Sequence, residues 1–184
     1  KNFSQGNHIT TDNALDVTIQ GAGFFEILMP DGTISYTRNG QLTTDSEGNL
    51  VTSGAGYQIQ PTITVPPDAI EINISQDGEV SVKLQGQADN AVLGQLTVTN
   101  FINPAGLEPI GQNLFKQTGA SGDPVQGVPG LEGLGYIVQG ALESSNVNVT
   151  EELVGLIESQ RVYEMNSKVI TAVDQMLSYA VQNL

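Results

Sequence analysis

The sequence predicts a mainly β domain followed by one long C-terminal helix. Two observations predict the β part: apolar and polar residues alternate along many short segments before residue 143, and Gly, Pro, Asn and Asp separate these segments. A third observation predicts the helix, because apolar residues recur at steps of three and four from Ser145 to Leu184 with no intervening proline. We therefore expect a β domain over residues 1–143, with antiparallel strands, and a helix over residues 144–184.

Turn signals divide the β domain into hairpins. Pro30-Asp31-Gly32, Asp45 to Gly48 and Asp77-Gly78 place Pro or Gly where tight turns need their backbone angles, and Asn39-Gly40 is the strongest short hairpin signal. Residues 1–12 form an extended N-terminal segment, and residues 103–135, rich in Gly, Pro, Asn and Gln, form an irregular surface loop. The expected strands cover residues 15–19, 24–29, 33–37, 42–44, 49–52, 57–60, 62–65, 70–74, 80–84, 92–101, with a bulge at Gly94, and 136–143.

The helix has an apolar seam of the coiled-coil type. Asn148 caps its first turn, and Glu151, three residues later, reaches back as in a capping box. In alternating steps of four and three residues from Val149, eight of eleven positions are apolar. These eight are the candidate assembly residues: Val149, Leu153, Leu156, Tyr163, Ile170, Leu177, Val181 and Leu184.

The other residues of the helix indicate what covers this seam. Its polar positions, Gln160, Ser167 and Asp174, either fix the register among neighbouring helices or mark places where the seam shifts sideways. A helix of about 50 Å, at roughly 1.5 Å per residue, either folds back over its own β domain or packs against other copies, and its length favours other copies. A second stripe makes the C-terminal half apolar on more than one side: Val162, Met165, Val169, Val173, Met176 and Ala180.

Composition excludes several classes of protein. With 20 acidic and 6 basic residues the net charge is -14, which argues against a nucleic-acid partner and requires any contact between copies to be mainly apolar. The chain has no cysteine, no apolar run long enough to insert into a membrane and no secretory signal peptide. Because it begins with Lys1 rather than Met, we expect that its true N-terminus has been removed.

The sequence predicts no catalytic, cofactor-binding or metal-binding residues. The only histidine, His8, lacks a nucleophile motif, and Gly21-Ala22-Gly23 lacks the third glycine of a dinucleotide fingerprint. Asp45, Glu47 and Asn49 alternate as oxygen ligands do, but no acid follows at the Ca²⁺-loop spacing, so a hairpin turn is the better interpretation. We expect a protein that is not an enzyme, with a secreted β-domain enzyme or carbohydrate-binding module as the alternative class.

Short motifs spread over nearly the whole chain are specific in combination. They are Ser4-Gln5-Gly6, Ile19 to Phe25, Pro30-Asp31-Gly32, Tyr36 to Gly40, Gly48 to Thr52, Ser145 to Leu153, Gln160 to Lys168 and Asp174 to Leu177. Together they resemble the bacterial flagellar rod and hook protein family. Two more motifs, Asn103 to Leu107 and Gly111 to Phe115, favour the distal-rod branch of that family over proximal-rod or hook members.

The resemblance implies a structural subunit of the distal rod, exported through the flagellar type III channel. Such subunits polymerise helically into a hollow drive shaft that crosses the periplasm in the basal body and transmits torque from motor to hook. The implied partners are copies of the chain itself, neighbouring rod and hook proteins, and the surrounding ring proteins. The family's N-terminal helix, which pairs with the C-terminal helix in the axial core, is absent from these residues, so we expect this chain alone to stay monomeric.

Overall fold

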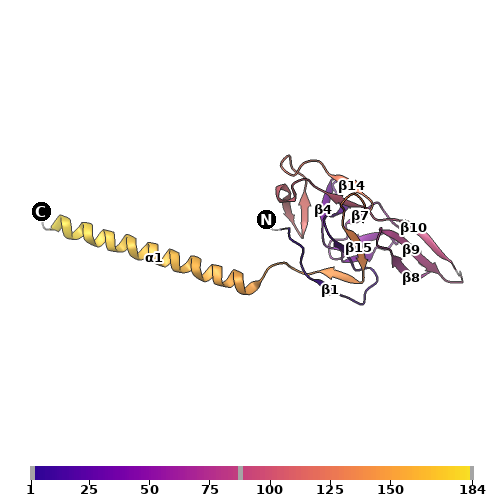
Figure 1. The fold of residues 1–184 in the computed structure, drawn as a ribbon, viewed down its shortest axis with the longest axis horizontal. Helices are drawn as coiled ribbons and strands as arrows, with labels where there is room; N and C mark the ends of the chain where they lie inside the picture. The colour runs from indigo at the N-terminus through magenta and orange to yellow at the C-terminus, as the bar shows by residue number, and fades with distance from the viewer. Residues whose placement is uncertain (1–2, 87–88, 183–184) are drawn as a thin grey trace. The chain divides into compact units, whose positions relative to one another are not determined.

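The computed structural model describes residues 3–86 and 89–182, with the side chains of the helix described as far as Ser178. The chain divides into two units, Lys1–Ser145 and Asn146–Leu184, here called the β unit and the helical unit. The β unit holds the strands, and the helical unit holds α1 (Val149–Gln182), as Figure 1 shows. Every described strand pairing is antiparallel, which confirms the predicted fold class.

A seven-stranded sheet forms the centre of the β unit, in the order β12-β13-β4-β3-β7-β6-β5. Two predicted turns connect its hairpins: Gly32, with φ of 80°, lies in the β3–β4 turn, and Gly48, with φ of 85°, lies in the β5–β6 turn. Its strands are β3 (Phe25–Leu28), β4 (Ile34–Thr37), β5 (Leu42–Thr44), β6 (Leu50–Thr52), β7 (Gln58–Gln60), β12 (Glu108–Gly111) and β13 (Leu114–Lys116).

Smaller sheets surround this centre. A three-stranded sheet in the order β10-β9-β8 forms one end of the β unit (Figure 1), and a register shift beside Gly94 confirms the predicted bulge. Three two-stranded ribbons pair β1 with β16, β11 with β14, and β15 with β2. These strands are β1 (His8–Thr10), β2 (Val17–Gln20), β8 (Ala69–Ile74), β9 (Glu79–Leu84), β10 (Asn90–Gln95), β11 (Val98–Asn100), β14 (Val125–Gly127), β15 (Tyr136–Gln139) and β16 (Ala141–Glu143), with a 3-10 turn η1 at Pro104–Gly106.

The structure corrects five local predictions. Asn39-Gly40 does not close a hairpin, because β4 pairs with β3 and β13 while β5 pairs with β6. Residues 103–135 are not one irregular loop, because they contain η1, β12, β13 and β14. Residues 62–65 form a single bridge, Asn49 to Thr64, rather than a strand. The strands expected at 92–101 and 136–143 are each split in two.

The middle strands of the central sheet carry buried residues on both faces. Phe25 of β3 and Ile59 of β7 belong to the main core, which also takes Val80 and Val82 from β9. On the other face Tyr36 packs edge-on against Phe101 at 4.7 Å between ring centroids. This second cluster also contains Phe24 and Leu107, with Phe3 and Phe115 packed against it. The apolar–polar alternation of the strands produces both layers, since successive side chains point to opposite faces.

Candidate assembly interface

The helix α1 begins where the sequence predicts. The side-chain oxygen of Asn148 accepts a hydrogen bond from the Thr150 N–H at 3.1 Å, and its carbonyl accepts the first helical bond from Glu152 N–H at 3.1 Å. A capping oxygen satisfies a donor that the first turn leaves without a partner. Glu151 and Glu152 add negative charge at the positive end of the helix dipole. These contacts fix the start of a helix of 34 residues.

The seam predicted from the sequence is exposed wherever its side chains are described. Its exposed fractions run from 54% for Leu153 to 78% for Tyr163. Val149, Leu156, Ile170 and Leu177 lie between these values. Of the other two candidate residues, Val181 belongs to α1 but its side chain lies outside the described residues, as does Leu184 altogether. The described seam is thus an apolar surface that the helical unit does not bury.

The second apolar stripe is equally exposed and longer than predicted. Met165 is 59% exposed and Met176 is 70% exposed, on a different side of the helix from the seam. Sequence reasoning missed Val154, 51% exposed, and Ile157, 47% exposed. Val154 lies eleven residues before Met165, which is about three helical turns, so it extends the second stripe toward the N-terminal end. The spacing of eleven was the signal that could have found it.

Some of the charged residues of α1 lie on a strip between the two apolar stripes, here called the charged strip. At about 100° per residue, Arg161, Glu164 and Lys168 fall on this strip, together with Gln175. The spacing of Glu158 with Arg161, and of Glu164 with Lys168, suits ion pairs, but neither pair comes within 4.0 Å in this structure. The charged strip therefore offers a polar face, although Ile157 lies at its N-terminal end and Glu158 falls on the second stripe.

The polar residues of the seam repeat every seven positions. Gln160, Ser167 and Asp174 are all exposed, and the Ser167 carbonyl accepts a hydrogen bond from the Thr171 hydroxyl at 3.2 Å. A seven-residue repeat is the period at which coiled-coil helices meet their neighbours. The seam therefore carries three polar positions at the spacing of a coiled-coil repeat.

The residues considered for chemistry in the β unit take part in its local structure. His8 lies exposed in β1, where Gln5 contacts its Nε2 at 3.0 Å and Thr18 contacts its Nδ1 at 3.4 Å. A side-chain hydrogen bond from Asn49, with backbone hydrogen bonds, holds the pKa of Asp45 below its usual value. Asp45 Oδ1 accepts the backbone N–H groups of Glu47 and Asn49, both at 2.8 Å, so it organises the β5–β6 turn.

The described residues offer neither a membrane-spanning helix nor a metal-binding cluster. Among them, α1 is long enough but lacks the continuous apolar stretch that a bilayer span requires. The same residues contain no group of three or more His, Cys, Asp or Glu arranged to hold a metal ion.

Two family models match the chain. The model described as the flagellar hook protein FlgE/F/G D1 domain matches residues 18–82. The model described as the flagellar basal body rod FlgEFG protein C-terminal region matches residues 138–183. Together the two matches cover more than half of the chain, and the second includes all of α1.

Curated relatives point to one branch of this family. The flagellar basal-body rod protein FlgG of Buchnera aphidicola subsp. Schizaphis graminum is 52% identical over 96% of this chain and 68% of the relative. FlgG of Agrobacterium fabrum is 50% identical over 98% of this chain and 69% of the relative. The flagellar hook protein FlgE of Salmonella typhimurium is 34% identical over 81% of this chain, but this match covers only 35% of the hook protein.

The matches to FlgG are therefore both more similar and more complete than the match to a hook protein. The chain spans about two thirds of the length of the FlgG relatives. The family models and the relatives agree with the motifs found along the whole sequence. The chain belongs to the flagellar hook and rod protein family, in its FlgG basal-body rod branch, and is a structural protein of the flagellar basal body.

Proposed function

We propose that this chain polymerises helically with copies of itself into the distal rod, and that α1 forms the axial core of that assembly. In this proposal the β unit forms the outer layer, where it meets neighbouring rod and hook proteins and the surrounding rings. The assembled shaft transmits torque from the motor to the hook. The role is structural rather than enzymatic.

The observation that carries the proposal is the exposed apolar surface of α1. A helix with apolar side chains on more than one side is expected to be buried in its working state. Yet every described residue of the seam is exposed: Leu156, for example, is 57% exposed and Ile170 is 63% exposed. Helices of neighbouring copies would cover both the seam and the second stripe, and leave the charged strip toward solvent.

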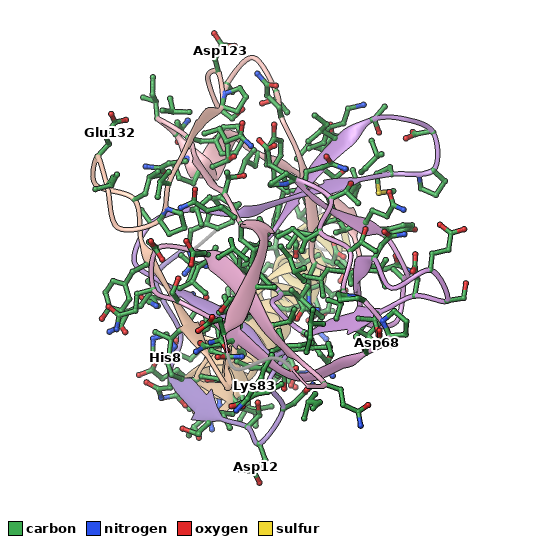
Figure 2. The ribbon with its side chains drawn as sticks, turned by 90° about the vertical axis from the view of Figure 1, so that its right-hand side faces the viewer. His8, Asp12, Asp68, Lys83, Asp123 and Glu132 are labelled. Atoms are coloured by element: carbon green, nitrogen blue, oxygen red, sulfur yellow. The ribbon has the colours of Figure 1, made fainter. Side chains whose placement is uncertain are left out.

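The charge of the chain supports an apolar contact. The net charge is -14, and the labelled Asp12, Asp123 and Glu132 point outward at the edge of the β unit in Figure 2. Acidic surfaces on identical copies repel each other unless something else holds them together. Burial of apolar area, at about 25 cal/mol per Å², provides the attraction that the surface charges oppose.

The direct test replaces Leu156, Ile170 and Leu177 by Asp in the full-length rod protein. We expect a folded β unit but no distal rod and no swimming, because three charges cannot be buried in an apolar helix bundle. Electron microscopy of basal bodies and a swimming assay measure the two outcomes. Normal rods in this variant would reject the role of α1.

A matched pair of single variants separates the apolar seam from charge alone. Ile170→Asp and Gln175→Asp each add one negative charge at an exposed position of α1. Only Ile170 belongs to the seam, whereas Gln175 lies on the charged strip. We expect Ile170→Asp to impair rod assembly and Gln175→Asp to leave it intact.

A further inference from the structure

A groove of about 510 Å³ crosses one face of the central sheet. Its apolar walls are Leu28 of β3, Ile34 of β4 and Pro61 after β7, and Ile34 is 46% exposed. Glu26 also lines it, one step along β3 from the core residue Ile27. We call this feature the Glu26 groove. It lies on the same sheet face as Tyr36, because Glu26 and Tyr36 are cross-strand partners.

The carboxylate in this groove has only neutral partners. Glu26 is 8% exposed, and its Oε1 accepts a hydrogen bond from the Thr99 hydroxyl at 2.7 Å. Its Oε2 accepts one from the Gln126 side-chain amide at 3.2 Å. No cation comes within 4.0 Å of Glu26 among the residues that the structure describes. Burial, followed by the charge of Glu26, raises the pKa of Tyr36.

A buried carboxylate beside apolar walls fits one kind of side chain. Lysine has an aliphatic stem that can lie against apolar residues and a cationic end that can pair with a carboxylate. A carboxylate this deeply buried gains most from a charge-assisted hydrogen bond, since neutral donors compensate its desolvation less well. The Glu26 groove therefore has the chemistry to receive a lysine from outside the molecule.

Two described lysines of the β unit make no ion pair, and Lys83 is the one that lies outside the central sheet, whereas Lys116 belongs to β13 of that sheet. Arg38 pairs with Glu143 at 2.9 Å. Hydrogen bonds from Thr33 lower the pKa of Asp31, and the charge of Lys116 lowers it further, so Lys116 lies near an acid. Lys83 is exposed near the end of β9, next to its last residue Leu84, and no carboxylate comes within 4.0 Å of its amine in the described part of the chain.

The position of Lys83 suits a contact with another copy. It lies on the three-stranded sheet, which faces the viewer in Figure 2. Its strand neighbours Val80 and Val82 are fully buried, so Lys83 points to the opposite, outer face of that sheet. Its cross-strand partners there are Glu71 and Asn90.

A helical polymer needs two different surfaces on every copy. A head-to-tail contact that does not close into a ring joins one patch to a second, complementary patch and repeats without end. The Glu26 groove and the outer face of the three-stranded sheet differ in this way. One presents a buried carboxylate between apolar walls, and the other presents an exposed lysine.

Resting on the proposed function, we propose that Lys83 of one copy inserts into the Glu26 groove of the next copy in the rod. Its stem lies along Leu28, Ile34 and Pro61, and its ammonium group donates to the Glu26 carboxylate. The contact sets the register between β units, since paired charges add specificity more than affinity. The apolar surfaces of α1 supply most of the attraction between copies.

A double-mutant cycle in the full-length rod protein tests the contact. Lys83→Met keeps most of the apolar stem and removes the charge, and Glu26→Gln removes the negative charge with little change in volume. We expect each variant to raise the critical concentration for assembly roughly tenfold, and the double variant to raise it no further, because both remove one interaction. Lys116→Met is the matched control and should leave the critical concentration unchanged.

Other outcomes overturn the proposal. Additive effects of the two variants would show that Lys83 and Glu26 act separately. An effect of Glu26→Gln without one of Lys83→Met would assign the groove to a different cation. An equal effect of Lys116→Met would show that any lost positive charge weakens assembly.

Two further variants keep the result interpretable. Urea unfolding of each monomer identifies variants that assemble poorly because they fold poorly, and Ile34→Ser, at an exposed wall of the groove, replaces Glu26→Gln if the latter does not fold. Ile170→Asp in the same assay tests the proposed function by itself. If Ile170→Asp assembles normally the role of α1 fails, whereas additive Lys83 and Glu26 effects reject only the contact proposed here.

Discussion

Arg38 and Glu143 form an ion pair, with 2.9 Å between Arg38 Nε and Glu143 Oε2, that joins distant segments of the β unit. The Arg38 Nη1 group also donates to the carbonyl oxygens of Gly21 and Gly23. The second carboxylate oxygen of Glu143 accepts the Gly6 N–H at 3.0 Å. Because Glu143 ends β16, the last strand before α1, the pair anchors both terminal segments of the β unit.

Removal of the arginine should destabilise the β unit. In Arg38→Met the Glu143 carboxylate, with its side chain 13% exposed, loses its cation, and the two glycine carbonyls lose a donor. We expect the free energy of unfolding to fall by about 3 kcal/mol, the scale for breaking a largely buried pair. Urea unfolding followed by circular dichroism measures it. Lys116→Met, at an exposed position, is the control, and equal midpoints for the two variants would contradict the anchoring role.

Gly40 should tolerate no side chain, for a reason unrelated to hairpins. A Cβ at Gly40 would lie 1.7 Å from the Val17 carbonyl oxygen, which is far inside contact distance. Gly40→Ala must therefore push β2 away from the β4–β5 connection, and we expect the free energy of unfolding to fall by about 2–4 kcal/mol. Gly119→Ala is the matched control, because a Cβ there meets nothing within 4 Å. If both variants unfold at the same urea concentration, the close approach does not exist in solution.

Acid should weaken the β5–β6 turn through Asp45. A side-chain hydrogen bond from Asn49, with backbone hydrogen bonds from Asn49, Glu47 and Gly48, lowers the pKa of Asp45. A carboxyl group whose pKa is lower in the folded chain than in the unfolded chain stabilises the folded state. This contribution is fully present above the unfolded pKa of about 3.9, and it is lost as the pH falls through the folded pKa.

The corresponding measurement compares urea midpoints between about pH 5 and pH 2.5, a range that brackets the unfolded pKa of Asp45. Asp45→Asn keeps an oxygen acceptor for the turn but cannot titrate, so its midpoint should fall less steeply with acid. Ser46→Ala leaves the Asp45 hydrogen bonds in place, so its urea midpoint should change with pH as that of the unmodified protein does. An Asp45→Asn variant with the same steep decline would assign the acid sensitivity to other groups.

The sequence predicted elements that depend on local pattern. Alternation predicted most strands of the central sheet, and the turn residues Gly32 and Gly48 have the positive φ angles that their turns require. The strands missed in residues 103–135 depend on long-range pairing, such as Leu114 with Thr37 and Asn100 with Val125. Those strands are only three or four residues long, and β12 and β14 include Gly or Pro, so no alternation was visible.

The candidate interface was partly predictable for the same reason. The seam of α1 follows from helical spacing alone, and its six described candidate residues lie on the exposed helix as expected. The Glu26 groove was invisible in the sequence, because Thr99 and Gln126 reach Glu26 only through the paired β11 and β14. Arg38 and Glu143, 105 residues apart, are likewise brought together by folding.

Added salt should strengthen assembly of the full-length protein. The net charge of -14 makes neighbouring copies repel, and salt shortens the screening length from roughly 10 Å at 0.1 M to roughly 3 Å at 1 M. The apolar contacts of α1 do not depend on that screening. The Lys83–Glu26 contact does not reverse the trend, since Glu26 is 8% exposed and buried pairs are screened less.

Measurement of the critical concentration at roughly 0.05 M and 0.5 M sodium chloride checks this expectation, since the screening length shortens over that range. The value should fall with salt for the unmodified protein, and Gln175→Asp should show a steeper fall because it adds one more charge to screen. Ile170→Asp should remain impaired at both salt concentrations, because screening does not remove the cost of burying a carboxylate in an apolar seam. A critical concentration that rises with salt would mean that ion pairs, rather than the apolar surface of α1, hold the copies together.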